Sequence, residues 1–270
     1  MKKFPIGIQL YSIRNELAEN FEATINKLAE FGYDAVETAG LYDRSPEEFR
    51  AVCDAAGLEI ISAHVGRDEL YNDSSCGEKY RKLGCKYIGV GYGPIMHAGG
   101  PEFERGLEML RRISSDLKKY GIDLMYHNHD WEFEYLDGYH KLDILYSTLA
   151  PDILKCEIDT CWAKVAGEDP ANYILKYKGR LPLLHVKDFS GLRHCWANPE
   201  TFAIETSYYP KKPYEYRPIG YGEQNIPNLL AAAEKAEVKY LIVEQDEPSL
   251  GKTPLECAKL SANYIKSILG

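Results

Sequence analysis

Short apolar segments alternate with longer amphipathic segments along the chain, and this alternation is the feature that most restricts its fold. Eight segments have the apolar character of buried strands, and eight others have the pattern of helices that cover them. Glycine ends four of the predicted helices, and the next strand follows at once. The predicted strands span 6–10, 35–36, 58–63, 87–90, 122–126, 154–158, 181–186 and 240–243, and the predicted helices span 21–31, 46–56, 78–83, 102–120, 141–149, 170–177, 226–236 and 254–268.

Eight strand and helix pairs in 270 residues predict a TIM (β/α)8 barrel, with residues 1–270 forming a single domain. An open doubly wound sheet is the alternative, but no G-x-G-x-x-G sequence opens a helix here. A TIM barrel has its active site at the carboxyl ends of its strands. Residues at those positions are therefore the candidates for chemistry.

One long segment, about 190–221, follows the seventh predicted strand and is rich in tyrosine, proline, lysine and tryptophan. A loop of this length in a compact domain is usually functional. We expect it to form a lid over the active site or a contact in a homo-oligomer. A solvated insertion with a small core of its own is the alternative.

Composition and charge exclude several classes of protein. A net charge of −9 repels polyanions, and no basic run interleaved with aromatic residues offsets it, so we expect no nucleic-acid partner. No apolar run approaches the length of a membrane span, and the first residues lack the apolar core of a secretory signal. The seven cysteines form no C-x-x-C pair. We therefore expect a cytoplasmic protein with no membrane partner.

Ionisable residues stand where several predicted strands end. Asp159, His185 and Glu244 follow or end three different strands, and Lys187 lies two residues after His185 on the same face. Such groups converge on one divalent cation if their strands are parallel neighbours in a barrel. Asp159 alone is also consistent with an N-cap, and the acidic run that begins at Glu244 is also consistent with an exposed loop.

The fifth predicted strand ends in two histidines. His127 and His129 are two residues apart, so both point to the same side of the strand. His64 ends the third predicted strand, and Glu37 ends the second. Each is either a participant in the site or a residue that makes ordinary capping contacts.

Seven short stretches in a fixed order resemble one known family, the xylose isomerase-like TIM barrel superfamily. The resemblance is to its sugar phosphate isomerase/epimerase branch, which includes inosose isomerases, inosose dehydratases, tagatose epimerases and hydroxypyruvate isomerases. Together the stretches are specific for the superfamily but not for a substrate. They are GYDAVE at 32–37, SAH at 62–64, YHNHDWEF at 126–133, EIDT at 157–160, HVKD at 185–188, PIGYGE at 218–223 and VEQD at 243–246.

The resemblance implies one divalent metal ion, manganese, cobalt, magnesium or zinc, bound at the ends of strands five to eight. Asp159, His185 and Glu244 match three of the family's ligands, and His127 stands where the epimerases have a glutamate. This departure resembles the inosose dehydratases and removes one of the two carboxylates of an epimerase proton relay. Arg217, ahead of a Pro-x-Gly-x-Gly turn, matches an arginine that contacts substrate oxygens in the epimerases.

These residues lead us to expect a metal-dependent isomerase or epimerase that acts on a ketose or keto-sugar by proton transfer next to a carbonyl. Glu244, His127 and Lys187 are the expected acid and base groups. The expected metal ligands are His127, Asp159, His185 and Glu244, and the expected substrate-binding residues are His64, His129, Trp162, Arg217 and Glu37.

Three alternatives remain open. Loss of a β-hydroxyl or a glycosidic oxygen would make the protein a dehydratase or a lyase that cleaves 3-keto-glycosides. A carbohydrate-binding barrel without catalysis would need no stoichiometric ion. An apurinic endonuclease of the same superfamily would need a basic face and a larger histidine cluster than seven histidines readily supply.

Overall fold

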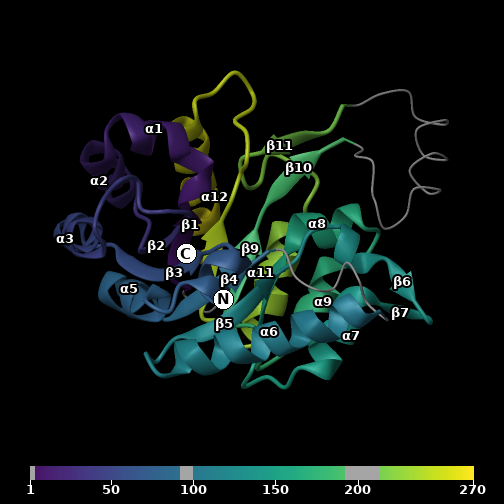
Figure 1. Ribbon diagram of the computed structural model, residues 1–270. Coiled ribbons are helices and arrows are strands. Elements are labelled where there is room, and N and C mark those ends of the chain that lie inside the picture. The colour runs from purple at the N-terminus through teal and green to yellow at the C-terminus, as the bar shows by residue number, and fades with distance from the viewer. Residues whose placement is uncertain (1–3, 92–99, 192–212) are drawn as a thin grey trace.

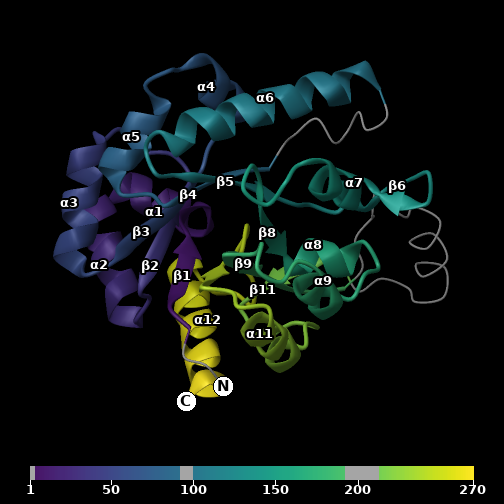
Figure 2. The ribbon, with the colours of Figure 1, turned by 90° about the horizontal axis from the view of Figure 1, so that it is seen from below.

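Eight parallel strands close into a barrel, and helices surround it (Figures 1 and 2). The structure is a computed structural model, and it describes residues 4–91, 100–191 and 213–270. The prediction of a TIM barrel is confirmed, and the open sheet is excluded because β1 pairs with both β2 and β12. In their order around the barrel the strands are β1 (Ile6–Gln9), β12 (Tyr240–Val243), β9 (Leu183–Val186), β8 (Lys155–Asp159), β5 (Asp123–His127), β4 (Tyr87–Val90), β3 (Glu59–His64) and β2 (Ala35–Thr38).

Local capping chemistry sets the limits of the main helices. Ser45 and Thr253 each form a capping box ahead of a proline, and Gly32 and Gly57 end their helices in the left-handed conformation. The eight predicted helices lie within two residues of the observed bounds. These helices are α2 (Phe21–Phe31), α3 (Pro46–Ala56), α5 (Cys76–Leu83), α6 (Pro101–Lys118), α7 (Lys141–Thr148), α9 (Pro170–Lys176), α11 (Ile226–Lys235) and α12 (Pro254–Leu269).

Several short elements were not predicted, because their patterns are too short to stand out from the loops. Two of them, β10 (Asp188–Ser190) and β11 (Glu215–Arg217), pair antiparallel and extend away from the barrel (Figure 1). β10 ends at the first residue of the predicted insertion at 190–221, and β11 lies within it. Residues 192–212 of this insertion lie outside the described residues. Its role as a lid or an oligomer contact stays a prediction. The other short elements are η1 (Leu10–Ile13), α1 (Arg14–Glu19), α4 (Arg67–Asn72), η3 (Trp131–Phe133), β6 (Tyr135–Leu136), β7 (Tyr139–His140) and α8 (Thr160–Val165).

Alternation along the strands divides the apolar residues into two clusters. The larger cluster includes Val36, Leu124 and Leu184, which pack against the surrounding helices. The smaller cluster lies inside the barrel, because its members occupy the alternate positions of the same strands. It consists of Ala35, Ile61, Tyr87, Met125, Leu183 and Ile242. This layer fills the barrel below the carboxyl ends of the strands.

The next inward position is polar after four members of this layer. Glu37, His127, His185 and Glu244 each stand two residues after a member of the inner apolar layer. The period of two along a strand therefore places their side chains in the barrel, one layer closer to its carboxyl end. Among the described residues, no helix combines the length and the apolar character needed to cross a bilayer.

Candidate active site and metal centre

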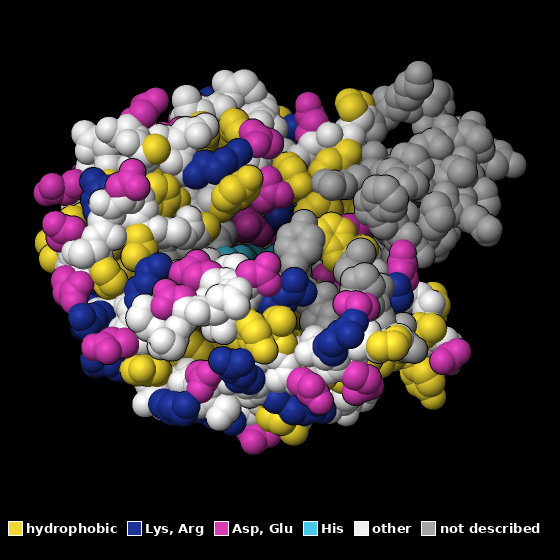
Figure 3. Space-filling view, viewed as in Figure 1, with side chains coloured by type: hydrophobic (Ala, Val, Ile, Leu, Met, Phe, Trp, Pro, Cys, Tyr) yellow, Lys and Arg dark blue, Asp and Glu magenta, His cyan; other side chains and the backbone are white. Residues whose placement is uncertain are grey.

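A cavity of about 550 Å³ opens at the carboxyl end of the barrel, a size typical of small-molecule sites. Histidine and acidic side chains lie at the bottom of a hollow on this face (Figure 3). Aromatic rings and charged groups together form the wall, as a site for a polar molecule with apolar faces requires. The lining residues used below are His64, His127, His129, Trp162, Lys187, Tyr216, Glu244 and Asp246.

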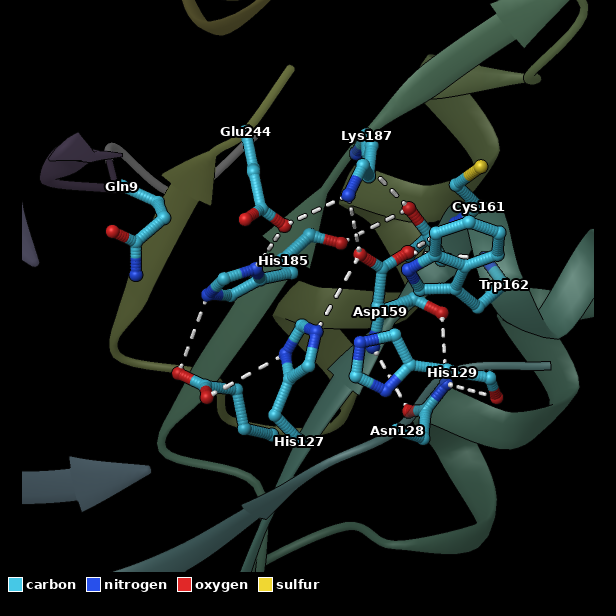
Figure 4. Close-up of polar contacts among 12 residues, drawn as sticks. Gln9, His127, Asn128, His129, Asp159, Cys161, Trp162, His185, Lys187 and Glu244 are labelled. Carbon is cyan, nitrogen blue, oxygen red and sulfur yellow. Dashed lines mark hydrogen bonds and ion pairs between the residues drawn. The ribbon is translucent and has the colours of Figure 1, made fainter. Parts of the chain in front are cut away.

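Four side chains from four neighbouring strands meet at the base of this cavity (Figure 4). Two of them, His127 and Glu244, line the cavity, and the other two, Asp159 and His185, are completely buried beside them. His127, Asp159, His185 and Glu244 each offer one ligand atom, and these atoms all lie within 4.8 Å of one another. The structure therefore brings together the four residues predicted as metal ligands. Two imidazoles and two carboxylates form a donor set that suits zinc, manganese or cobalt.

Asp159 serves two purposes at once. Its Oδ1 accepts hydrogen bonds from the backbone N–H groups of Cys161 at 2.7 Å and Trp162 at 3.1 Å, so it is the N-cap of α8. Its Oδ2 is buried without a hydrogen-bond partner and lies 4.0 Å from Nε2 of His127. Asp159 can therefore be both an N-cap and a metal ligand, because each role uses a different carboxylate oxygen.

The electrostatics of the floor fit a bound cation. Burial lowers the pKa of His127 well below its ordinary value, and the nearby His185 and His64 lower it further, which keeps a lone pair on the ring. Burial also raises the pKa of Asp159 to about 6, against the opposing effect of Lys187. A buried carboxylate with a raised pKa lacks sufficient positive charge nearby. A divalent cation between His127 and Asp159 would supply it.

Lys187 is buried among three carboxylates. Its Nζ lies 2.8 Å from Oδ1 of Asp246, 3.1 Å from Oε2 of Glu244 and 3.8 Å from Oδ2 of Asp159. Burial alone would lower the pKa of Lys187, but these carboxylates raise it well above its ordinary value. Lys187 is therefore an ammonium group, suited to donate hydrogen bonds. The rings of Trp162 and Tyr216 each have their centre 5.1 Å from Nζ.

The pKa of Glu244 shifts in the opposite direction from that of Asp159, although the two carboxylates share neighbours. Burial would raise the pKa of Glu244, but Lys187 and His185 hold it well below its usual range. Geometry explains the difference, because Nζ of Lys187 is 0.7 Å closer to Glu244 than to Asp159. Glu244 is consequently ionised at the cavity wall, as a general base must be.

The predicted substrate-binding residues divide into two groups. His64, His129 and Trp162 line the cavity, where a substrate would contact them. Glu37 lies beneath the floor with no exposed surface, and its carboxylate is bonded to protein groups. Arg217 is paired with Glu215 at 2.5 Å on β11 and is not among the lining residues. Its neighbour Tyr216 lines the cavity, since adjacent strand residues face opposite sides.

Three residues of this site were not predicted from the sequence: Glu157, Gln9 and Tyr216. Glu157 is completely buried under the floor, and Gln9 lines the cavity. A signal for Glu157 was present, because it stands two residues before Asp159 and therefore shares its side of the strand. The role of Tyr216 depends on the β10–β11 hairpin, and the sequence of this hairpin shows no clear strand pattern.

Comparison with known proteins agrees with this description. Residues 25–268 match the family model described as xylose isomerase-like TIM barrel. An inosose dehydratase of Geobacillus kaustophilus is 26% identical over 215 residues, which cover 68% of this chain and 69% of the relative.

Solved structures also share the fold. A sugar phosphate isomerase/epimerase from Parabacteroides distasonis superposes with a TM-score of 0.78 and 21% identity, covering 99% of this chain and 95% of that one. The IOLI protein, crystallised with a bound zinc atom, superposes with a TM-score of 0.71 and 12% identity over 98% of both chains.

Proposed function

The chain belongs to the xylose isomerase-like TIM barrel family, and from this premise we propose that it is a divalent metal-dependent enzyme that moves a proton next to a carbonyl in a keto-sugar. One observation carries the proposal. His127, Asp159, His185 and Glu244 converge from four strand ends within 4.8 Å at the floor of a cavity large enough for a sugar. The zinc atom in the related IOLI structure supports a metal at this kind of barrel.

The chain's own groups have separate tasks in this chemistry. A divalent cation would polarise a carbonyl oxygen and stabilise the negative charge that develops there. Glu244, ionised and at the wall, takes the proton from the adjacent carbon. Lys187 donates hydrogen bonds from its ammonium group to a substrate oxygen, and Trp162 packs against an apolar face of the sugar.

Return of the proton to the same or the neighbouring carbon gives epimerisation or isomerisation, and we take this as the principal reaction. The names of the solved relatives support it. The substrate class is a ketose or keto-sugar, because the reaction requires an acidic hydrogen beside a carbonyl.

Dehydration is the second candidate, and a specific observation favours it. The two acidic residues named on the cavity wall, Glu244 and Asp246, both contact Lys187, whereas His127 occupies the ligand position from β5. An elimination needs one base and one acid for the leaving hydroxyl, so it does not require a second carboxylate on the other face. Curated relatives named inosose dehydratase point the same way.

NMR in deuterated water distinguishes these reactions. Ketoses, 3-keto-glucosides and inososes would be incubated separately with enzyme that has been loaded with manganese, cobalt or zinc. The metal is removed from each sample before the spectrum is recorded. Isomerase or epimerase activity incorporates solvent deuterium at one carbon of a saturated product, and dehydratase activity yields an unsaturated ketone. The proposal would be contradicted if none of the three substrate classes showed deuterium exchange or a product with any of the three metals. Protein treated with a chelator is the control.

A further inference from the structure

Two glutamates lie directly beneath the proposed metal centre, and the proposed chemistry uses neither. Glu37 on β2 and Glu157 on β8 have no exposed surface. An ionised carboxylate at such a position is costly unless donors surround it. The contacts of these two residues therefore indicate what keeps them there.

Glu37 accepts hydrogen bonds from three side chains. Nε2 of Gln9 donates to its Oε1 at 2.7 Å, and Oγ of Ser62 donates to its Oε2 at 2.5 Å. The orientation of the Gln9 amide is fixed, because its oxygen accepts from the backbone N–H of Tyr11 at 3.0 Å. The third donor is His185, whose Nε2 lies 2.7 Å from Oε1 of Glu37. Nε2 of His64 also lies 3.1 Å from this oxygen, but it is closer to Glu157, at 2.8 Å.

The backbone of β2 and β3 is shaped to allow this arrangement. The register shifts between the two strands, so that Val36 pairs with Ile60 whereas Glu37 pairs with Ser62. Ile61 is the extra residue, and the shift lets both Ile61 and Ser62 contribute to the barrel interior. Without it, the Ser62 hydroxyl would follow the outward alternation and leave Glu37 without this donor.

These contacts determine which nitrogen of His185 would keep its proton when a cation is bound. An ionised carboxylate only accepts hydrogen bonds, so Nε2 of His185 must be the N–H group. The other nitrogen, Nδ1, points into the proposed metal centre and lies 3.1 Å from Oε2 of Glu244 (Figure 4). Without a cation, the carboxylate of Glu244 would hold a proton on Nδ1 as well. A cation bound by Glu244 would take the place of that proton, so the lone pair on Nδ1 would then face the cation.

Glu157 has a related position below His127. Its Oε2 is 2.8 Å from Nε2 of His64 and 3.7 Å from Nδ1 of His127, a nitrogen that makes no hydrogen bond within the described part of the chain. Its Oε1 also lies 3.5 Å from Nε2 of His185. The influence of Glu157 on His127 is therefore electrostatic. The opposite nitrogen, Nε2 of His127, faces Asp159. The nearby carboxylate favours a proton on Nδ1, which leaves the lone pair on Nε2. The two histidines thus present different nitrogens to the same centre, each with a carboxylate behind it.

We propose that Glu37 and Glu157 are positioning residues that hold His185 and His127 in opposite tautomers, with Nδ1 of His185 and Nε2 of His127 directed at the cation. The inference rests on the proposed metal-dependent function. Carboxylates behind ligating histidines fix the ring orientation and raise the basicity of the ligand nitrogen. Neither glutamate contacts the substrate in this arrangement.

The lower group has a competing interpretation as a second metal site. His64, His127, Glu157 and His185 also offer ligand atoms that lie within 4.8 Å of one another. If both sites were filled, His127 and His185 would each bridge two cations and would have to lose both ring protons. The N–H of His185 is instead directed at Glu37, so we assign one cation to the upper group. A count of bound ions decides between the two.

The first experiment measures zinc binding to Glu37→Gln, Glu157→Gln and the unaltered protein by competition with a chromophoric chelator. We expect each variant to bind zinc about 10-fold to 100-fold more weakly, with one ion per chain in the unaltered protein. Asp143→Asn is the control, since Asp143 is another carboxylate bonded to protein side chains, those of Tyr173 and Tyr177, but it belongs to α7 on the outside of the barrel. It should lose stability without losing zinc affinity.

The second experiment reads the tautomers in the unaltered zinc-bound protein. Long-range ¹H–¹⁵N spectra of ¹⁵N-histidine protein, assigned with single histidine variants, should show Nε2–H on His185 and Nδ1–H on His127. This measurement decides the matter even if a glutamate variant does not fold. The reverse tautomers, zinc affinity unchanged in both variants, or two ions per chain would overturn the inference. A protein that binds no divalent ion would instead refute the proposed function.

Discussion

The two ends of the barrel both carry ion pairs of similar length but in very different surroundings. At the amino end, Lys86 contacts Glu59 at 2.6 Å, and 57% and 41% of their side chains are exposed. At the carboxyl end, Lys187 contacts Glu244 at 3.1 Å, and 2% and 8% are exposed. Contact distance does not distinguish the two ends. Burial does, because water screens the first pair and not the second.

This difference shows that the cost of burying charged side chains is concentrated at the carboxyl end of the barrel. The amino-end pair contributes at most about 1 kcal/mol, as exposed pairs generally do. The carboxyl-end group keeps four carboxylates, those of Glu37, Glu157, Asp159 and Glu244, away from solvent. Such a concentration of buried charge is unfavourable unless cations or donors compensate for it. A divalent ion bound by His127, Asp159, His185 and Glu244, as proposed, would compensate for part of it. The predictions below test the contrast between the two ends.

Removal of the metal should have the largest effect. Chelation followed by dialysis should abolish turnover of the keto-sugar substrate, since the ion stabilises the developing charge. Addition of manganese, cobalt or zinc should restore it, and a calorimetric scan should show a lower melting temperature without metal. If protein that contains no metal by mass spectrometry were fully active, the carboxyl-end group would not need an ion for its function, and this part of the comparison would fail.

Glu244→Gln should have the next largest effect, a loss of at least about 100-fold in turnover, because an amide cannot accept a proton at neutral pH. Glu59→Gln makes the same chemical change at the amino end and should leave turnover within about twofold of normal, because Glu59 is remote from the cavity. Steady-state kinetics of both variants provide the test. Retention of more than about a tenth of turnover in Glu244→Gln would remove Glu244 from the role of base.

Substitution of a lysine by methionine at each end should have unequal effects on stability. Lys187→Met leaves Glu244, Asp246 and Asp159 without their shared cation and should lower the free energy of unfolding by about 3 to 5 kcal/mol. Lys86→Met should lower it by about 1 kcal/mol or less. Denaturant unfolding of chelated protein measures both changes, and equal changes would show that burial is not the deciding factor.

The sequence predicted the barrel well because its signals are local and repeated. Strand alternation, capping boxes at Ser45 and Thr253, and glycines after helices act within a few residues, so they can be identified without the rest of the fold. The candidate ligands His127, Asp159, His185 and Glu244 were recognisable because they stand where apolar strands end. Their convergence required only that the strands be parallel neighbours.

The parts that were not predicted depend on contacts across the barrel. The partnership of Glu37 with His185 joins β2 to β9, and it depends on a register shift that no local pattern in the sequence indicated. Glu37 therefore looked like a substrate contact, although the structure buries it below the cavity floor. The roles of Arg217 and Tyr216 depend likewise on which side of β11 faces the cavity.

A crystal structure of the protein soaked with manganese tests the central claim most directly. The account predicts a single strong anomalous peak at the cavity floor, with ligand atoms of His127, Asp159, His185 and Glu244 at about 2.0 to 2.4 Å from it. A peak bound by His64 and Glu157 below the cavity floor, or no peak at the carboxyl end of the barrel, would contradict the account.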